Sequence, residues 1–455
     1  MFSEQALKFN KFEIQSNEDG KIIDLRSGSP MFEYRESVFS PYIEITTHLV
    51  DTGNTVEKDD GDGSAVGLLE AGYCQGTEVV KFNIEDRLGR KINLTKDSDL
   101  RLSSVTSAKQ SFQNQTFTIT AVGKEAFDNT LIDNRCRRQY SGKISDIALR
   151  IIKEDLKCAK WGGTYVDATS NEYHEFGQDR YPFEMLLDLQ KLAIPDLQTS
   201  DGKIATGQTA GYLFWQTWDR YHFRSLDKLF DVTDKQIRKF IENKKSGDGI
   251  PEGYDAKIFY SEMFRSTNAL EEFESGGRGS LIQVYNEVTK DFTDHQLAST
   301  GKGNGITGGR HLPKLHSDYE GKLTTRQVTR AAVGQTVKGN ESVEMQVEKT
   351  AEPNYEVQNI FQQAHQSYRQ KMNVSLEVIV AADLSLRAGD LIYCEFEDMT
   401  TSKTVRGSKK RDSGIYMIAD LCHYGDVTTA FTGLNLVRDA YGAKSLEGSA
   451  KSLSS

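Results

Sequence analysis

The chain has 455 residues, of which 37% are hydrophobic and 27% charged, a balance typical of a folded protein with long polar loops rather than a disordered one. Its formal net charge of −10 argues against binding nucleic acid through the overall field of the protein, because phosphate contacts need Lys and Arg. The five cysteines are odd in number and include no CxxC pair, which argues against a zinc site and against a disulfide framework.

The first residues, MFSEQALKFNKFEIQ, lack both the basic segment and the continuous apolar segment of a secretory signal. No stretch of the chain approaches the roughly 18 apolar residues that a membrane-spanning helix needs. We therefore expect a soluble protein that is made in a cytoplasm and does not insert into a membrane.

Residues 1–135 are predicted to form a first small β-barrel. Several short runs of alternating apolar and polar residues, such as Phe117, Ile119 and Ala121, are separated by turn signals. This spacing is typical of a small barrel or sandwich.

Residues 136–298 are predicted to form an α/β insertion. One helix is expected after residue 144 with Ser145 as its N-cap, and a second is expected to begin at Pro182. An aromatic hairpin follows, with strands at 212–216 and 221–224 and a turn near Trp218.

The tryptophans of this hairpin, Trp215 and Trp218, fit a core anchor and an interface anchor equally well. A sugar-binding platform is a weaker interpretation.

Residues 299–370 are predicted to form a polar loop region that ends in an amphipathic helix. The expected apolar face of that helix contains Val357, Ile360, Phe361, Ala364 and Tyr368.

The loop region also contains His311 and His316. They are expected to be surface residues, because a metal site needs further ligands on a rigid frame.

Residues 371–445 are predicted to form a second barrel, followed by a flexible tail at 446–455. The strand near residue 392 has two apolar faces. One carries Ile392, Cys394 and Phe396, and the other carries Leu391 and Tyr393. A surface hairpin needs only one apolar face. The second face is therefore expected to meet a neighbouring domain or subunit.

No catalytic set and no cofactor site is predicted, so we expect a binding or assembly component rather than an enzyme. The candidate interface residues are Leu391, Tyr393, Trp215, Trp218 and Tyr221.

A basic run between two expected strands contains Lys403, Arg406, Lys409, Lys410 and Arg411. It is interpreted either as a solvated hairpin loop or as a loop that docks an acidic partner or nucleic acid.

Five separated stretches together resemble one family, the central baseplate hub proteins of contractile-tailed bacteriophages and the related hub-like part of type VI secretion spike proteins. They are FEYRESVFSPYIEITTHLVDTGN with GYCQGTEVVKFNIED, RRQYSGKISDIALRIIKEDL, GYLFWQTWDRYHFRSLDKL, LEVIVAADLSLRAGDLIYCEF, and SGIYMIADLCHY with FTGLNLVRDAYG. They occur in the order of the family, between Phe32 and Gly442.

This resemblance implies a mainly β chain with α/β insertions and two related β-barrel hub domains. It implies a homotrimer without catalysis that adapts a six-fold tail tube to a three-fold central spike and leaves a channel for DNA. The implied partners are the central spike protein, the tail tube or tube-initiator protein and the baseplate wedge proteins. DNA would pass without specific binding, and the implied location is the virion baseplate, assembled in the host cytoplasm.

Two alternatives remain open from the sequence. One is a hub or spike component of a type VI-like contractile injection system, which shares the fold. The other is a carbohydrate- or oligonucleotide-binding β-barrel module.

Overall fold

The fold is known from a computed structural model, in which strands account for 47% and helices for 18%. This confirms a mainly β fold with α/β insertions. The residues that the structure describes are 7–29, 31–57, 64–95, 100–110, 114–158, 165–196, 209–232, 237–242, 256–265, 268–286, 290–298, 308–310, 312–330, 342, 344, 357–397, 411–426 and 429–442.

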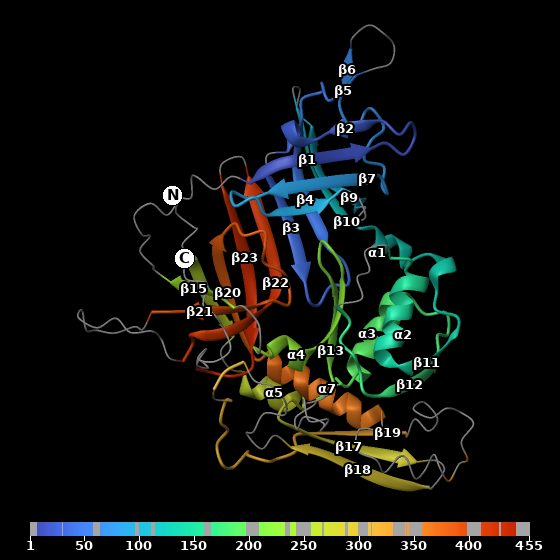
Figure 1. Cartoon of the computed structure of the whole chain (residues 1–455), viewed down its shortest axis with the longest axis vertical. Coiled ribbons are helices and arrows are strands. Elements are labelled where there is room, and N and C mark those ends of the chain that lie inside the picture. Colours follow the sequence, from blue (N-terminus) through green and yellow to red (C-terminus); the bar gives the residue numbers. More distant parts are fainter. Residues whose placement is uncertain are drawn as a thin grey trace, which may run out of the picture.

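The first domain is a curved antiparallel sheet, drawn in blue at the top of Figure 1. Its strands, in spatial order, are β2 (Ile22–Asp24), β1 (Lys8–Gln15), β7 (Val79–Glu85), β9 (Leu100–Gln110), β10 (Gln115–Gly123), β4 (Glu44–Asp51) and β3 (Met31–Ser37), with β8 (Lys91–Leu94) beside β7. Two short strands, β5 (Val56–Glu57) and β6 (Ala65–Val66), pair with each other, and a 3₁₀ turn, η1, covers Arg26–Gly28.

Aromatic packing connects β1, the second strand at one end of this sheet, with β3 at the other end. Among the described residues, β1 and β3 share no backbone pairing. Instead Phe9 of β1 meets Phe32 of β3 edge to face, with ring centroids 4.9 Å apart, and both belong to a cluster with Phe12 and Phe82. Along each of these strands every second side chain points inward, and the inward side chains therefore belong to one apolar core.

The second domain is a closed six-stranded barrel. Its strands, in order around the barrel, are β22 (Gly414–Asp426), β21 (Leu391–Glu395), β15 (Arg238–Glu242), β16 (Lys257–Arg265), β20 (Val374–Ala381) and β23 (Ala430–Arg438), and β23 pairs again with β22. The prediction of a second barrel is confirmed. The barrel extends beyond residues 371–445, because β15 and β16 come from the segment expected to form only the insertion.

Strand β22 belongs to both domains. Its first residues pair with β21 from Gly414 to Met417, and its last residues, Asp420 to Asp426, pair with β3 of the first domain. A bulge at Ala419 lies between the two parts. The two domains are thus parts of one continuous hydrogen-bonded sheet rather than units joined by a linker.

The insertion packs beside the joined domains as a helical lobe and a central hairpin (Figure 1). The lobe contains α1 (Lys124–Asp128), η2 (Ile132–Asn134), α2 (Ile144–Arg150), the π-helical turn η3 (Ile151–Asp155), α3 (Pro182–Leu192), and the paired strands β11 (Gln139–Lys143) and β12 (Glu172–Phe176). The hairpin is formed by β13 (Tyr212–Gln216) and β14 (Tyr221–Ser225), as predicted, and is followed by α4 (Leu226–Phe230).

Helix α3 begins at Pro182 as predicted, but Ser145 is not an N-cap. Helix α2 already begins at Ile144, and its N-cap is Lys143 without a side-chain cap. The Ser145 amide instead donates to Thr169 Oγ1 at 3.0 Å, because Ser145 is buried against the following loop.

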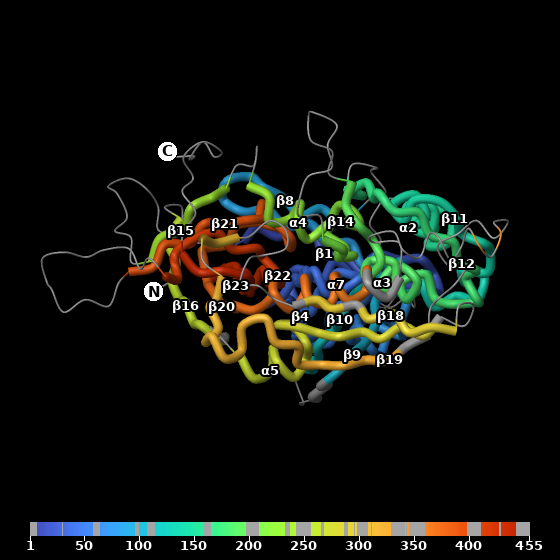
Figure 2. The backbone as a smooth tube through the Cα atoms, turned by 90° about the horizontal axis from the view of Figure 1, so that it is seen from below, coloured from blue at the N-terminus to red at the C-terminus, as the bar shows by residue number. Residues whose placement is uncertain are grey.

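A third layer lies at the other end of the molecule, below the hairpin in Figure 1, and Figure 2 shows its strands from below. It consists of β18 (Asp291–Ala298), β17 (Gly279–Asn286) and β19 (Thr325–Arg330), with α5 (Ala269–Glu274) and α7 (Val357–Lys371). Strand β19 lies in the region predicted to be loop.

Helix α7 confirms the predicted helix but not its full apolar face. Ile360 and Ala364 are buried, whereas Phe361 is 42% exposed. The buried side includes Gln362, whose amide donates to Ser280 of β17, so polar side chains hold this helix against the sheet. Among the described residues, no helix has the length and apolar character needed to span a bilayer.

Candidate assembly site

The two apolar faces of β21 are both covered by this chain. Ile392 and Cys394 point into the core of the second barrel. Leu391 and the partly buried Tyr393 lie on the outer face, in a second cluster that we call the hairpin cluster. The buried members of this cluster are Val38, Leu213, Trp215, Leu226, Leu229, Phe230, Ile237, Ala388, Leu391, Ile415, Met417, Ala419 and Val437. The second face of β21 is therefore covered by a neighbouring domain.

Trp215 lies at the centre of the contact between the hairpin and the second barrel. Its side chain is fully buried, and its Nε1 donates to the Ala388 carbonyl at 3.1 Å. One face of the indole stacks on His222, with ring centroids 4.5 Å apart. The indole also passes over Gly389, where an added Cβ would lie 2.6 Å from the ring and where φ is +91°. Glycine is needed here both for the close approach and for the left-handed backbone.

The burial of these side chains changes the interpretation of the candidate interface residues. Trp215 and Tyr221 have no exposed surface, and Leu391 is 8% exposed, so they join parts of one chain and are not available to a second subunit. For the same reason Trp215 cannot form a sugar-binding platform. Trp218 is partly buried, and the Arg387 guanidinium lies 5.2 Å from its ring centroid.

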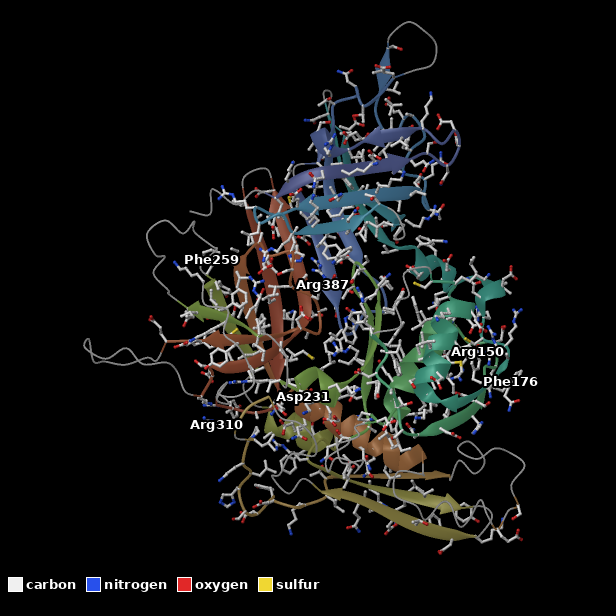
Figure 3. The ribbon with its side chains drawn as sticks, in the orientation of Figure 1. Arg150, Phe176, Asp231, Phe259, Arg310 and Arg387 are labelled. Carbon is white, nitrogen blue, oxygen red and sulfur yellow. The ribbon has the colours of Figure 1, made fainter. Side chains whose placement is uncertain are left out.

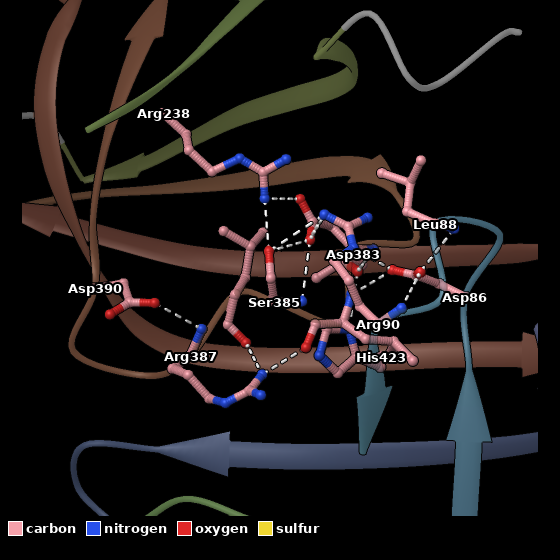
Figure 4. Close-up of polar contacts among 12 residues, drawn as sticks. Asp86, Leu88, Arg90, Arg238, Asp383, Ser385, Arg387, Asp390 and His423 are labelled. Carbon is pink, nitrogen blue, oxygen red and sulfur yellow. Dashed lines mark hydrogen bonds and ion pairs between the residues drawn. The ribbon is translucent and has the colours of Figure 1, made fainter. Parts of the chain in front are cut away.

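A charged joint lies where the first domain meets the second barrel (Figure 4). Asp383, in the connection between β20 and β21, is buried and pairs with Arg90 of the first domain at 2.6 Å and with Arg238 of β15. Arg90 also pairs with Asp86 at 2.5 Å, and Ser385 donates to Asp383 from both its amide and its hydroxyl. The joint brings together three segments that are far apart in the sequence.

Glu36 forms a second polar contact between the domains and the hairpin. Its carboxylate is buried and accepts hydrogen bonds from the Tyr34 hydroxyl at 2.6 Å, the Trp218 amide at 3.1 Å and the Ala388 amide at 3.1 Å. Burial raises the pKa of Glu36, and the nearby Arg387 guanidinium opposes that shift. Figure 3 shows Arg387 in the middle of the molecule, where the domains and the hairpin meet.

Sequence reasoning did not find these polar residues. Glu36, Arg90, Arg238 and Asp383 lie on different elements, and no local spacing connects them. The stretch LSLRAGD indicates a turn at this place in the fold, but it does not show which distant residues contact that turn.

The predicted basic docking loop lies outside the described residues, except for Arg411. Its guanidinium lies 4.6 Å from the ring centroid of Tyr441, and its carbonyl accepts from the Gly442 amide at 2.9 Å.

Of the two histidines in the polar region, His311 also lies outside the described residues. His316 is exposed and pairs with Asp318 at 3.2 Å. Within the part of the chain that the structure describes, no three His, Cys, Asp or Glu side chains are grouped so that they could hold a metal ion.

The geometry defines two β domains that share one sheet and are flanked by a helical lobe. Solved structures similar to this chain include phage and prophage tail proteins. The 43 kDa tail protein of prophage MuSo2 from Shewanella oneidensis is 11% identical, with a TM-score of 0.47, and the match covers 96% of this chain and 99% of that one. The tail protein from Neisseria meningitidis MC58 is 9% identical, with a TM-score of 0.46, and coverages of 96% and 97%.

A type VI secretion protein is also similar. The E. coli c3393 protein is 8% identical, with a TM-score of 0.39, and the match covers 96% of this chain and 79% of that one. No protein-family model and no curated protein sequence matches the chain. The similar structures include phage and prophage tail proteins and a component of a type VI secretion system.

Proposed function

We propose that the chain is a structural component of a phage tail baseplate and forms its trimeric central hub. In this role it would adapt the six-fold tail tube to the three-fold central spike and leave a channel for DNA. The partners would be the spike protein, the tail tube or tube-initiator protein and the wedge proteins. The role is structural and requires no catalysis.

The observation that supports this proposal is the fusion of two β domains through β22. Because both domains share hydrogen bonds with one strand, their relative orientation is fixed within each subunit. Three such subunits around an axis would present six domains, which is the count that a six-fold tube requires. A cyclic arrangement also closes, so that no copy is left with an unused contact surface.

The test is the oligomeric state of the purified chain. We expect light scattering after gel filtration to give three times the chain mass, either for the chain alone or after addition of the spike protein. Electron microscopy should then show a three-lobed ring with a central hole. A chain that stays monomeric, and binds neither a spike nor a tube protein, would contradict the proposal.

A further inference from the structure

A groove lies on the outer face of the shared sheet. It has a volume of about 390 Å³ and crosses β20, β23, β22 and β3, where the two domains meet. Its lining residues are Arg35, Glu36, Ser37, Ser40, Tyr42, Glu44, Glu377, Asp420, Leu421, Cys422, Gly433, Leu434 and Asn435. The groove lies on the opposite face of β22 from the apolar core, because outward residues such as Cys422 alternate with buried residues such as Leu421.

The floor of this groove has no side chain where β23 crosses it, and the backbone conformation at that position does not require glycine. Gly433 lies inside β23, its φ is not in the left-handed region, and an added Cβ would have no heavy atom closer than 3.9 Å. Glycine weakens a strand interior, so its usual explanation is strain or a close approach. Gly425 of β22 shows such an approach, since a Cβ there would collide with the Phe32 ring. At Gly433 the glycine instead leaves space that an added side chain would fill.

Acidic side chains outnumber basic ones among the lining residues of the groove. Arg35 is the one Lys or Arg among the lining residues, and it is already paired with Glu33 at 2.5 Å. Glu44, Glu377 and Asp420 supply negative charge. Glu44 stands directly opposite Arg35, and Asp420 accepts hydrogen bonds from Ser37 and Asn435, which are uncharged donors. Like charges directly opposite each other on one face destabilise a sheet. Such a pair stands at the groove, because Glu377 of β20 faces Glu262 of β16. A positive group brought by a partner would relieve this repulsion.

The spacing of the carboxylates favours an organic cation over a metal ion. Among the described residues they do not form a group that could hold a metal. Tyr42, 36% exposed, adds an aromatic side chain to the lining. Carboxylates next to an aromatic ring suit a guanidinium or ammonium group, which forms charge-assisted hydrogen bonds and cation–π contacts.

We propose that this groove receives an arginine- or lysine-bearing extended segment of another subunit of the assembly. The backbone of the segment would lie over Gly433. Its cation would lie above Asn435, which stands between Glu377 and Asp420 in the register of the sheet. This inference rests on the proposed function only in naming the source of the segment. The recognition itself follows from the shape and charge of the groove.

The test uses the purified full chain and a fluorescein-labelled peptide of alternating glycine and arginine. The same peptide with glutamine in place of arginine is the probe control. Binding is followed by fluorescence anisotropy at physiological salt, where exposed charges are strongly screened beyond about 8 Å. We expect the arginine peptide to bind and the glutamine peptide not to bind.

Two variants separate the groove from the general acidity of the chain. Gly433→Val fills the floor without changing charge, and the double variant Glu377→Gln with Asp420→Asn removes charge without filling the floor. Each should weaken peptide binding at least tenfold. The matched control, Glu172→Gln with Glu184→Gln, removes the same charge from exposed positions on the helical lobe and should bind as the wild type does.

Unchanged peptide binding by Gly433→Val would overturn the proposal, because binding would then follow net charge alone. A folding defect is separable, since valine favours strands and the urea midpoint of Gly433→Val should equal or exceed that of the wild type. The oligomeric state is measured separately. A chain that binds the peptide in the groove but stays monomeric, and binds neither a spike nor a tube protein, would contradict the hub. A trimer whose groove does not bind the peptide would contradict the docking of a basic segment in the groove.

Discussion

The second barrel has a covered side and an open side, and the same strand, β22, runs through both. On the covered side the outward residues Ile415 and Met417 are buried as members of the hairpin cluster. On the open side the outward residues Asp420 and Cys422 line a groove. The barrel core is the same behind both, so the stability of the barrel does not require its outer wall to be apolar. One side of the barrel therefore packs against the rest of the chain, and the other side is open to solvent.

The largest effect is expected on the covered side, from Trp215→Ala. The change removes a fully buried indole and its hydrogen bond to Ala388 and leaves a cavity beside Gly389. We expect a loss of about 3–5 kcal/mol in the free energy of unfolding. Urea unfolding followed by circular dichroism measures it.

A matched control for this prediction is Phe39→Ala, since Phe39 is 55% exposed. It should change the unfolding free energy by less than about 0.5 kcal/mol. Equal losses in the two variants would show that the covered side does not hold the chain together.

The second effect concerns His423, on the inner face of β22 behind the open side. Burial lowers its pKa to about 3, and Nδ1 lies 2.9 Å from Thr432 Oγ1. Between pH 6.5 and 3 the unfolded chain therefore binds a proton that the folded chain excludes, so the free energy of unfolding falls as the pH falls. The expected loss from this residue is roughly 2–3 kcal/mol by pH 4.5.

The measurement compares urea midpoints at pH 7 and pH 4.5 for the wild type and His423→Gln. The variant should lose less stability on acidification, because it has no imidazole to protonate. Buried His222, whose pKa is also lowered to about 3 by burial, would retain part of the dependence. An identical acid-induced loss in both proteins would exclude His423 as a source of it.

The smallest effect is expected at the charged joint, which connects the first domain to the barrel. Asp383→Ala would leave Arg90 and Arg238 without their shared carboxylate. Removing one partner of a buried pair costs about 3–5 kcal/mol, but both arginines are partly exposed, so we expect about 2 kcal/mol.

Asp383→Asn is the conservative control for the joint. It keeps an acceptor for Ser385 and should lose less than Asp383→Ala. If both variants were as stable as the wild type, the joint would not contribute to holding the domains together.

The elements that could be predicted from the sequence are those with strong local patterns. The hairpin at 212–225 and the helix beginning at Pro182 were predicted because their aromatic alternation and their proline signal are local. The two apolar faces of β21 correctly indicated that something covers Leu391.

The elements that could not be predicted depend on tertiary partners. Strand β15 covers only Arg238–Glu242, and it belongs to the barrel because it lies between β21 and β16. Phe361 has the spacing of a core residue, yet the sheet faces Gln362 instead. The groove could not be predicted either, since the sequence does not show that the space above Gly433 is open.

The shared strand β22 also has a mechanical consequence. Its backbone hydrogen bonds to β3, β21 and β23 are perpendicular to its length, as in any antiparallel ladder. A pull along the strand would load these bonds together in shear instead of opening them one after another. A force applied to one domain would thus be transmitted to the other without passing through a flexible connection, and the two β domains would move as one rigid body.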